Sequence, residues 1–138
     1  MKPIDISAIV QKILSALPGV AVSGGATSQT LDKLPACIWE VVSAVPATGS
    51  PRMGHAVAGT VNVHIYAPSR AESMRLCAEA VQLLETAHAL GPIVESSYVG
   101  RCWVEAEPIL AGSHTLHSVH VTETRATVRI VARGSLTI

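Results

Sequence analysis

Charge and aromatic rings are scarce in this sequence of 138 residues. Charged residues make up 14% of the chain, against about 25% in an average soluble domain. Ten Lys and Arg balance ten Asp and Glu, so the formal net charge is zero. Because binding to nucleic acids and to anionic membranes depends on surplus positive charge, neither is expected as the main partner. A surface with so little charge also repels its neighbours weakly, so we expect other subunits to cover much of it.

Cysteine and long apolar runs are also in short supply. Cys37, Cys77 and Cys102 are an odd number with no C-x-x-C pair, which argues against a disulfide framework or a structural zinc site. Each lies in an apolar segment, so buried free thiols are expected. No apolar run approaches the roughly 18–20 residues that span a bilayer. The first residues, Met1 to Asp5, lack the apolar core of a secretory signal, so a cytosolic site of synthesis is expected.

Aliphatic residues are plentiful, and their spacing predicts the fold of one domain, 1–138. Hydrophobic residues make up 49% of the chain, which is enough for a buried core. From Ile6 to Leu17 they recur every three or four residues, after a capping Asp5 and before a terminating Pro18-Gly19, so this segment is predicted to be a helix. Val20–Val22 is a possible short strand, and a polar loop, Ser23–Gln29, follows.

The middle of the chain has the pattern of a β-hairpin and a second helix. Cys37–Val45 and Val57–Tyr66 are predicted strands, joined by a long loop over 46–54. The capping box Ser69-Arg70-Ala71-Glu72 starts a helix predicted to reach about Leu90, with His88 on its apolar stripe.

Two more strands are predicted at Arg101–Glu107 and Val119–Arg133, with Ile109–His117 as a loop between them. The order α-(β)-β-β-α-β-β predicts an α+β fold. Its sheet is mostly antiparallel with four to five strands, and two helices pack on one face.

The search for catalytic or metal-binding chemistry finds no strong motif. His114, His117 and His120 form the densest histidine cluster, but on a strand His117 and His120 point in opposite directions, and no acid lies between them. The nucleophile elbow and both glycine-rich nucleotide motifs are absent. We therefore expect no enzymatic activity, no catalytic residues, no metal and no cofactor.

Charged residues on the last two strands are a candidate contact surface. Glu105 and Glu107 are expected to face solvent or to pair with arginines of the last strand rather than to act as paired catalytic acids. Arg125, Arg129 and Arg133 recur every fourth residue and so project from one strand face, which the helices leave uncovered. Two interpretations stay open: a solvated face, or a surface that meets acidic groups of a neighbour or lines a channel.

The order of elements resembles that of the tail terminator (tail completion) proteins of long-tailed bacteriophages, over nearly the whole chain. The resemblance depends on the helix Ile4–Leu17 ended by Pro18-Gly19, the strand opened by Leu34-Pro35-Ala36-Cys37, the strand Val61–Ala67, the turn Pro68–Glu72, the late loop with Pro108, and the strand Thr124–Val131. It implies a structural protein whose hexameric ring caps the tail tube, ends its polymerisation and joins it to the head-side connector, without a cofactor.

The resemblance also implies partners and a location. The partners are further copies of the chain, the major tail (tube) protein and a head–tail connector or stopper protein, with non-specific contact to DNA in the lumen and no membrane. The location is the tail and neck of the virion, and the host cytoplasm during assembly. Two alternatives stay open: another neck protein such as a head–tail stopper, or a small-molecule-binding or enzymatic α+β domain that uses His64, His114 or His120.

Three loops lack core patterning and are expected to order on contact with tube subunits: 46–55, 23–33 and 111–117. The candidate contact residues are Arg52, Met53, His55, Arg101, Glu105, Glu107, His114, His117, Arg125, Arg129 and Arg133.

Overall fold

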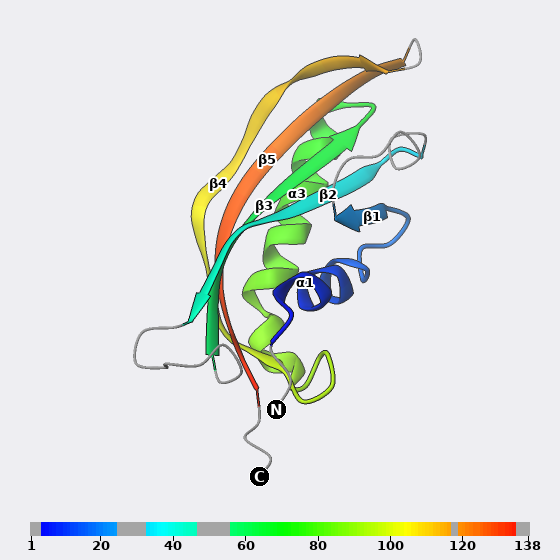
Figure 1. The fold of residues 1–138 in the computed structure, drawn as a ribbon. Helices are drawn as coiled ribbons and strands as arrows, with labels where there is room; N and C mark the ends of the chain where they lie inside the picture. Colours follow the sequence, from blue (N-terminus) through cyan, green and yellow to red (C-terminus); the bar gives the residue numbers. More distant parts are fainter. Residues whose placement is uncertain (1–3, 25–32, 47–55, 117–118, 135–138) are drawn as a thin grey trace.

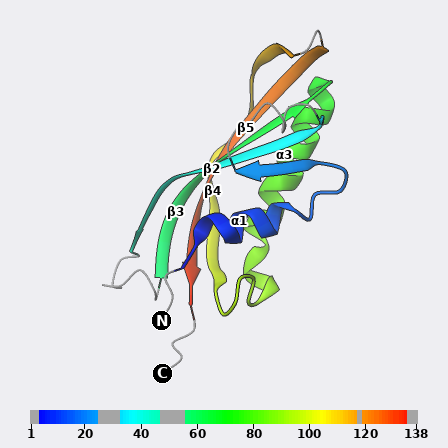
Figure 2. The same ribbon diagram turned by 45° about the vertical axis from the view of Figure 1, so that its right-hand side comes forward.

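Two helices lie on one face of a five-stranded sheet in a computed structural model that describes residues 4–24, 33–46, 56–116 and 119–134 (Figures 1 and 2). The elements are α1 (Ile6–Leu14), β1 (Ala21–Gly24), β2 (Ala36–Pro46), β3 (Ala56–Ala67), α3 (Arg70–Glu85), the 3-10 helix η1 (Ala87–Leu90), β4 (Tyr98–Leu116) and β5 (Val119–Arg133). The predicted α+β fold and its order of elements are confirmed.

The strands lie in the order β1-β2-β3-β5-β4. β2 pairs antiparallel with β3, β3 with β5, and β5 with β4. The two strands of the predicted hairpin, β2 and β3, are therefore neighbours in the sheet. The short strand β1 pairs parallel with β2, opposite Ala36–Trp39, so the sheet is mixed rather than purely antiparallel.

The predicted late loop is wrong: the segment Ile109–Leu116 is the second half of β4. It pairs with β5 from Ile109 opposite Arg125 to Leu116 opposite Val119. β4 has four register shifts along its length, and each shift moves the following side chains to the other face. The alternation of apolar and polar residues is therefore lost, although the backbone pairing continues. His117 lies outside the described residues.

Both helices begin where the sequence predicts. The Asp5 carboxylate accepts a hydrogen bond from the Ala8 amide at 3.1 Å, and the Ser69 hydroxyl accepts one from the Glu72 amide at 3.2 Å. The second helix ends at Glu85, earlier than predicted, and the chain tightens into η1 before Gly91, whose φ of 72° requires glycine. His88 consequently lies at the surface and not on the buried stripe.

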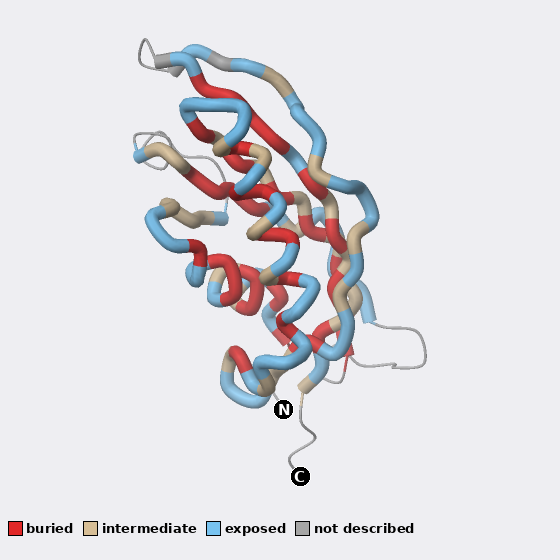
Figure 3. The backbone as a smooth tube through the Cα atoms, turned by 180° about the vertical axis from the view of Figure 1, so that it is seen from behind, coloured by how far each residue is buried: buried red, intermediate tan, exposed pale blue. Residues whose placement is uncertain are grey.

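The core lies between the helices and the inner face of the sheet, where Figure 3 shows buried positions recurring along β3 and β5. Its strand contribution is Val57, Val61, Val63 and Ile65 of β3 and Ala126, Val128, Ile130 and Ala132 of β5, each at most 1% exposed. Hydrogen bonds tie the layers together. The Trp39 indole donates to the Gln11 side chain at 2.7 Å, and the hydroxyls of Ser73 and Thr124 lie 2.7 Å apart.

All three cysteines are free, as predicted. Cys37 and Cys77 are buried and Cys102 is half-buried. Burial raises the pKa of each thiol to about 12, so all three stay protonated and unreactive at neutral pH. In the described ranges, none of the helices combines the length and apolar character needed to cross a membrane.

Candidate interaction surface on the outer face of the sheet

The outer face of the sheet, the one opposite the helices, carries the arginine row predicted from the sequence. Arg125, Arg129 and Arg133 alternate along β5 with the buried residues of the inner face. Cross-strand neighbours on β3 and β4 divide the row into two groups with different surroundings. Arg125 belongs to a polar cluster around the buried carboxylate of Glu123, whereas Arg129 and Arg133 belong to a patch around Trp103.

The exposed group, called here the basic–aromatic patch, consists of Arg101, Trp103, Glu105, Arg129 and Arg133. Trp103 on β4 lies directly opposite Arg129 on β5. The guanidinium carbon of Arg101 is 4.9 Å from the centroid of the Trp103 ring, and that of Arg129 is 6.0 Å away. These distances are within the range of cation–π attraction. The indole is 36% exposed, so the ring both holds the guanidinium groups and faces outward.

The patch has a surplus of positive charge. Its one carboxylate, Glu105, lies 3.8 Å from Arg129, as the predicted pairing of strand charges requires. The five residues of the patch thus include three guanidinium groups and one acid, which is paired with Arg129 alone. In addition, Arg129 Nε is buried and has no hydrogen-bond partner in the described structure. The patch therefore carries more positive than negative charge, although the Nε atom of Arg129 is not itself accessible to a partner.

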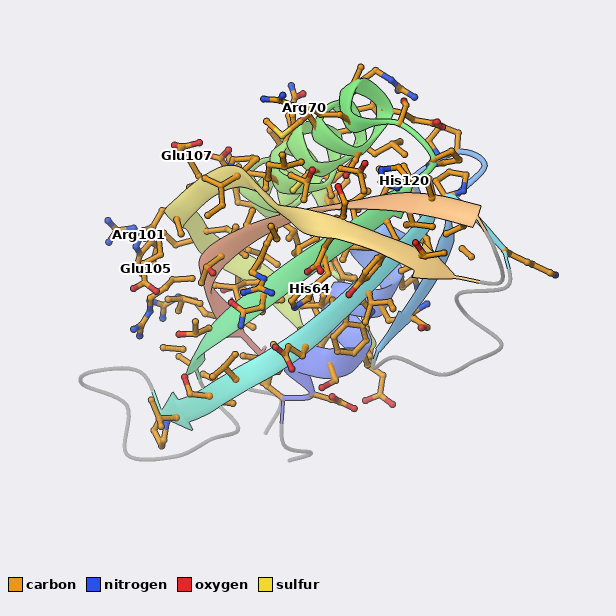
Figure 4. All side chains as sticks on the ribbon, turned by 90° about the horizontal axis from the view of Figure 1, so that it is seen from above. His64, Arg70, Arg101, Glu105, Glu107 and His120 are labelled. Atoms are coloured by element: carbon orange, nitrogen blue, oxygen red, sulfur yellow. The ribbon has the colours of Figure 1, made fainter. Side chains whose placement is uncertain are left out.

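Glu107, which the sequence groups with Glu105, lies within the register shift between Ala106 and Ile109. The structure records an ion pair for Glu105 but none for Glu107 within the described part of the chain. In Figure 4, Arg101, Glu105 and Glu107 extend from the first half and middle of β4, whereas His120 lies toward the far end of the β4–β5 pair.

The second group, called here the buried polar cluster after the buried carboxylate of Glu123, consists of Glu40, His64, Tyr66, Glu123 and Arg125, of which Glu40 and Arg125 reach the surface. Glu123 is only 5% exposed. Its Oε2 atom lies 2.8 Å from His64 Nδ1 and 3.3 Å from Arg125 Nη2. Glu40 approaches His64 from the other side, with 3.6 Å between Oε1 and Nε2. Burial, and then the charge of Glu123, raise the pKa of Tyr66 above its usual value.

A hydrogen-bond chain extends this cluster across three strands. The Thr127 hydroxyl donates to Asn62 Oδ1 at 2.7 Å, and Asn62 Nδ2 donates to Glu40 Oε1 at 3.3 Å. β5, β3 and β2 are thereby linked through their outer side chains. These side-chain contacts join three strands, which is consistent with a structural role in fixing the register of the sheet.

The sequence analysis did not find this cluster. Its members lie up to 85 residues apart, from Glu40 to Arg125, and meet only once the strand register is known. The usable signal was the polar side of β3, where Asn62, His64 and Tyr66 alternate with buried residues.

The structure describes few of the remaining predicted contact residues. Arg52, Met53, His55 and His117 lie outside the described residues, as do most of the two earlier loops, 46–55 and 23–33. His114 lies on β4 opposite Val121, with its side chain outside the description, and His120 is exposed on β5. Within the described ranges, His, Cys, Asp and Glu form no group of three or more that could hold a metal ion.

A groove of about 310 Å³ lies on the helical side, between the end of α1 and the second half of α3. It is lined by Ala16, Leu17, Pro18, Glu79, Gln82, Leu83 and Thr86. The one acid of this lining, Glu79, forms an ion pair with Arg75 at 2.9 Å. The lining residues do not form a set of nucleophile, general base and orienting group.

Comparison with known proteins finds similarity in structure only. No family model matches the sequence, and no curated protein matches it. A chain in the solved structure "Virion of native gene transfer agent (GTA) particle" has a similar fold, with a TM-score of 0.50 and 14% identity over 92% of both chains. A second solved structure, 16% identical over 91% of this chain and 86% of that chain, reaches a TM-score of only 0.38. At these identities the first match shows a shared fold.

Proposed function

We propose that this chain is a structural protein of a phage-like virion, whose ring caps the tail tube, ends its polymerisation and joins it to the head-side connector. The observation that carries the proposal is the fold shared with a chain of a gene transfer agent virion, because the match spans 92% of both chains. Because the match spans nearly all of both chains, the shared fold is that of the whole domain and not of one added module. The resemblance noted from the sequence supplies the finer assignment to a tail terminator with a hexameric ring.

The outer face supports a role in contacts between proteins. Trp and Arg are enriched in the centres of protein interfaces, and the basic–aromatic patch presents both at the surface. The proposed partners are neighbouring copies, the tube protein and the connector. In this proposal the surfaces carry the function, without enzymatic activity or a cofactor, in the virion and in the host cytoplasm during assembly.

The basic–aromatic patch has two possible positions in such a ring. It faces acidic groups of a neighbouring subunit, or it lines the lumen and contacts the phosphates of passing DNA without reading their sequence. Arg125 stays a candidate for either position, because its side chain is half exposed although it also contacts the buried Glu123.

The test is complementation of a particle from which the gene has been deleted, followed by electron microscopy of the tails. Loss of a terminator gives overlong tails without heads. Loss of a stopper, the alternative neck protein, leaves tail length normal and heads unattached. Normal tails with attached heads in the deletion would overturn the proposed function.

A triple variant, R101A/R129A/R133A, tests the patch. We expect it to fold but to complete few tails, whereas the charge-matched control K12A/R70A/R75A, whose three cations are exposed on the helices, restores normal tails. Rings that form and tails that reach normal length with the triple variant would show that the patch has no part in the function.

A further inference from the structure

The exposed apolar side chains concentrate on the two edges of the sheet. In the described residues, six large apolar side chains are exposed: Val42, Val45, Leu90, Trp103, Ile109 and Leu110. Two of these lie on the second half of β2 and two on the second half of β4. Single exposed aliphatic residues are ordinary, but pairs of them beside unpaired backbone are not.

The second half of β2 forms one free edge. β1 covers β2 only from Ala36 to Trp39, so the described structure places no strand beside the segment Val41–Pro46 (Figure 1). This segment, VVSAVP, carries no charge. It has one register shift, at Val42, and then pairs regularly with β3 from Ser43 to Pro46. Val45 is 51% exposed on it.

The second half of β4 forms the other free edge. β4 is the last strand of the sheet, and Figure 3 shows it largely exposed along its length. Its first half carries Arg101, Glu105 and Glu107, the kind of charges that keep an edge strand from pairing. The segment Pro108–Leu116 has no Asp, Glu, Lys or Arg, and its Ile109 is 60% exposed.

We propose that the free β2 edge of one copy, Val41–Pro46, pairs with the β4 edge of the next copy, Pro108–Leu116, so that the sheet continues from subunit to subunit. The inference rests on the proposed function and deepens it by naming the contact that builds the ring. Two different edges meet, so the contact is head-to-tail, which is the type that closes a ring or runs on as a filament.

The topology sets the direction of this pairing. β2 and β5 both run antiparallel to β3, and β4 runs antiparallel to β5, so β4 runs antiparallel to β2 within one copy. Rotation about an axis along the strands preserves strand direction. The β4 edge of one copy therefore meets the β2 edge of the next in an antiparallel ladder.

A second copy fits these edges better than a foreign peptide does. Each chain supplies both edges in equal number, both edges lack Asp, Glu, Lys and Arg, and each carries exposed aliphatic side chains, Val42 and Val45 on one and Ile109 and Leu110 on the other. A peptide of another protein would fill one edge and leave the other exposed. Six residues of β2 span about 20 Å, so a single ladder is a weak contact and its stability depends on protein concentration and on ring closure.

The test is light scattering of the purified protein over a range of concentrations, with one blocking variant for each edge. Val45→Lys blocks the β2 edge and Ile109→Lys blocks the β4 edge, and both side chains are exposed, so both variants should keep the wild-type circular dichroism and melting temperature. We expect the wild type to form oligomers and each variant alone to remain a monomer. Leu90→Lys is the matched control, because Leu90 is 62% exposed but lies on η1, outside both edges.

Mixing the two variants tests the head-to-tail arrangement directly. The Ile109→Lys chain still has its β2 edge and the Val45→Lys chain still has its β4 edge, so the mixture should give dimers and nothing larger. Oligomers of unchanged size in either variant, or a wild type that is monomeric at every concentration, would overturn the edge pairing. A monomeric protein that still restores tail length would overturn this inference alone, whereas normal tails in the gene deletion would overturn the proposed function alone.

Discussion

The two faces of the sheet use the same strands for different purposes. Along β5, the inner residues Val128 and Ile130 are completely buried against the helices, while their neighbours Arg129 and Val131 face outward. Burial of aliphatic surface is the main force that stabilises a domain of this size. Because side chains alternate along a strand, substitutions one residue apart separate the stability of the monomer from the contacts it makes.

The outer face is itself divided. In the buried polar cluster, the carboxylate of Glu123 is contacted by both His64 and Arg125 within the monomer. In the basic–aromatic patch, arginines outnumber acids and the indole of Trp103 is partly exposed. The first group holds strands together, and the second is available to a partner.

The largest expected effect on stability comes from a substitution on the inner face. Ile130→Ala should lower the free energy of unfolding by about 2–5 kcal/mol, because it leaves a cavity among fully buried side chains. Val131→Ala, one residue further along the same strand but half-buried on the outer face, should cost less than about 1 kcal/mol. Urea unfolding followed by circular dichroism measures both values. Equal losses in the free energy of unfolding would contradict the interpretation that the inner face stabilises the monomer more than the outer face does.

The parts of the fold with an uninterrupted period were predictable from the sequence. α1 buries Ile6, Ile9, Val10, Ile13 and Leu14 as its spacing of three and four requires, and β3 alternates without a break from Val57 to Ala67. The second half of β4 was missed because three register shifts between Val104 and Gly112 interrupt the alternation. Local pattern therefore predicts elements whose side-chain period is regular, and fails where pairing continues through bulges.

The candidate site was predictable only in part, for a related reason. The arginine row follows from spacing within β5, so it could be placed on one face. The division of that row into two groups could not be predicted, because it depends on which residue of the neighbouring strand lies opposite each arginine. His64 faces Arg125, and Tyr66 faces Glu123, only in the register that the whole sheet adopts. The free edges depend likewise on how far β1 extends along β2.

The next largest effect concerns the buried polar cluster. Glu123→Gln should lower the free energy of unfolding by about 1–3 kcal/mol, because the buried carboxylate that contacts His64 and Arg125 loses its charge. Glu105→Gln is the control on the exposed patch, where the ion pair is half exposed and should contribute less than about 1 kcal/mol. Thermal and urea unfolding of the two variants test the difference. If Glu105→Gln is the more destabilising change, the assignment of the two groups is reversed.

The smallest expected effect lies within the basic–aromatic patch. A double-mutant cycle with Trp103→Leu and Arg101→Ala should give a coupling energy of about 0.5–1 kcal/mol, the usual value of an exposed cation–π contact. The parallel cycle with Arg129→Ala should give a smaller coupling, since that guanidinium lies 6.0 Å from the ring rather than 4.9 Å. Because so little stability depends on these residues, losses in tail completion by R101A/R129A/R133A would reflect lost contacts with a partner rather than unfolding. A coupling energy as large as the loss of about 2–5 kcal/mol expected for Ile130→Ala would contradict this distinction. The patch would then stabilise the monomer as the core does.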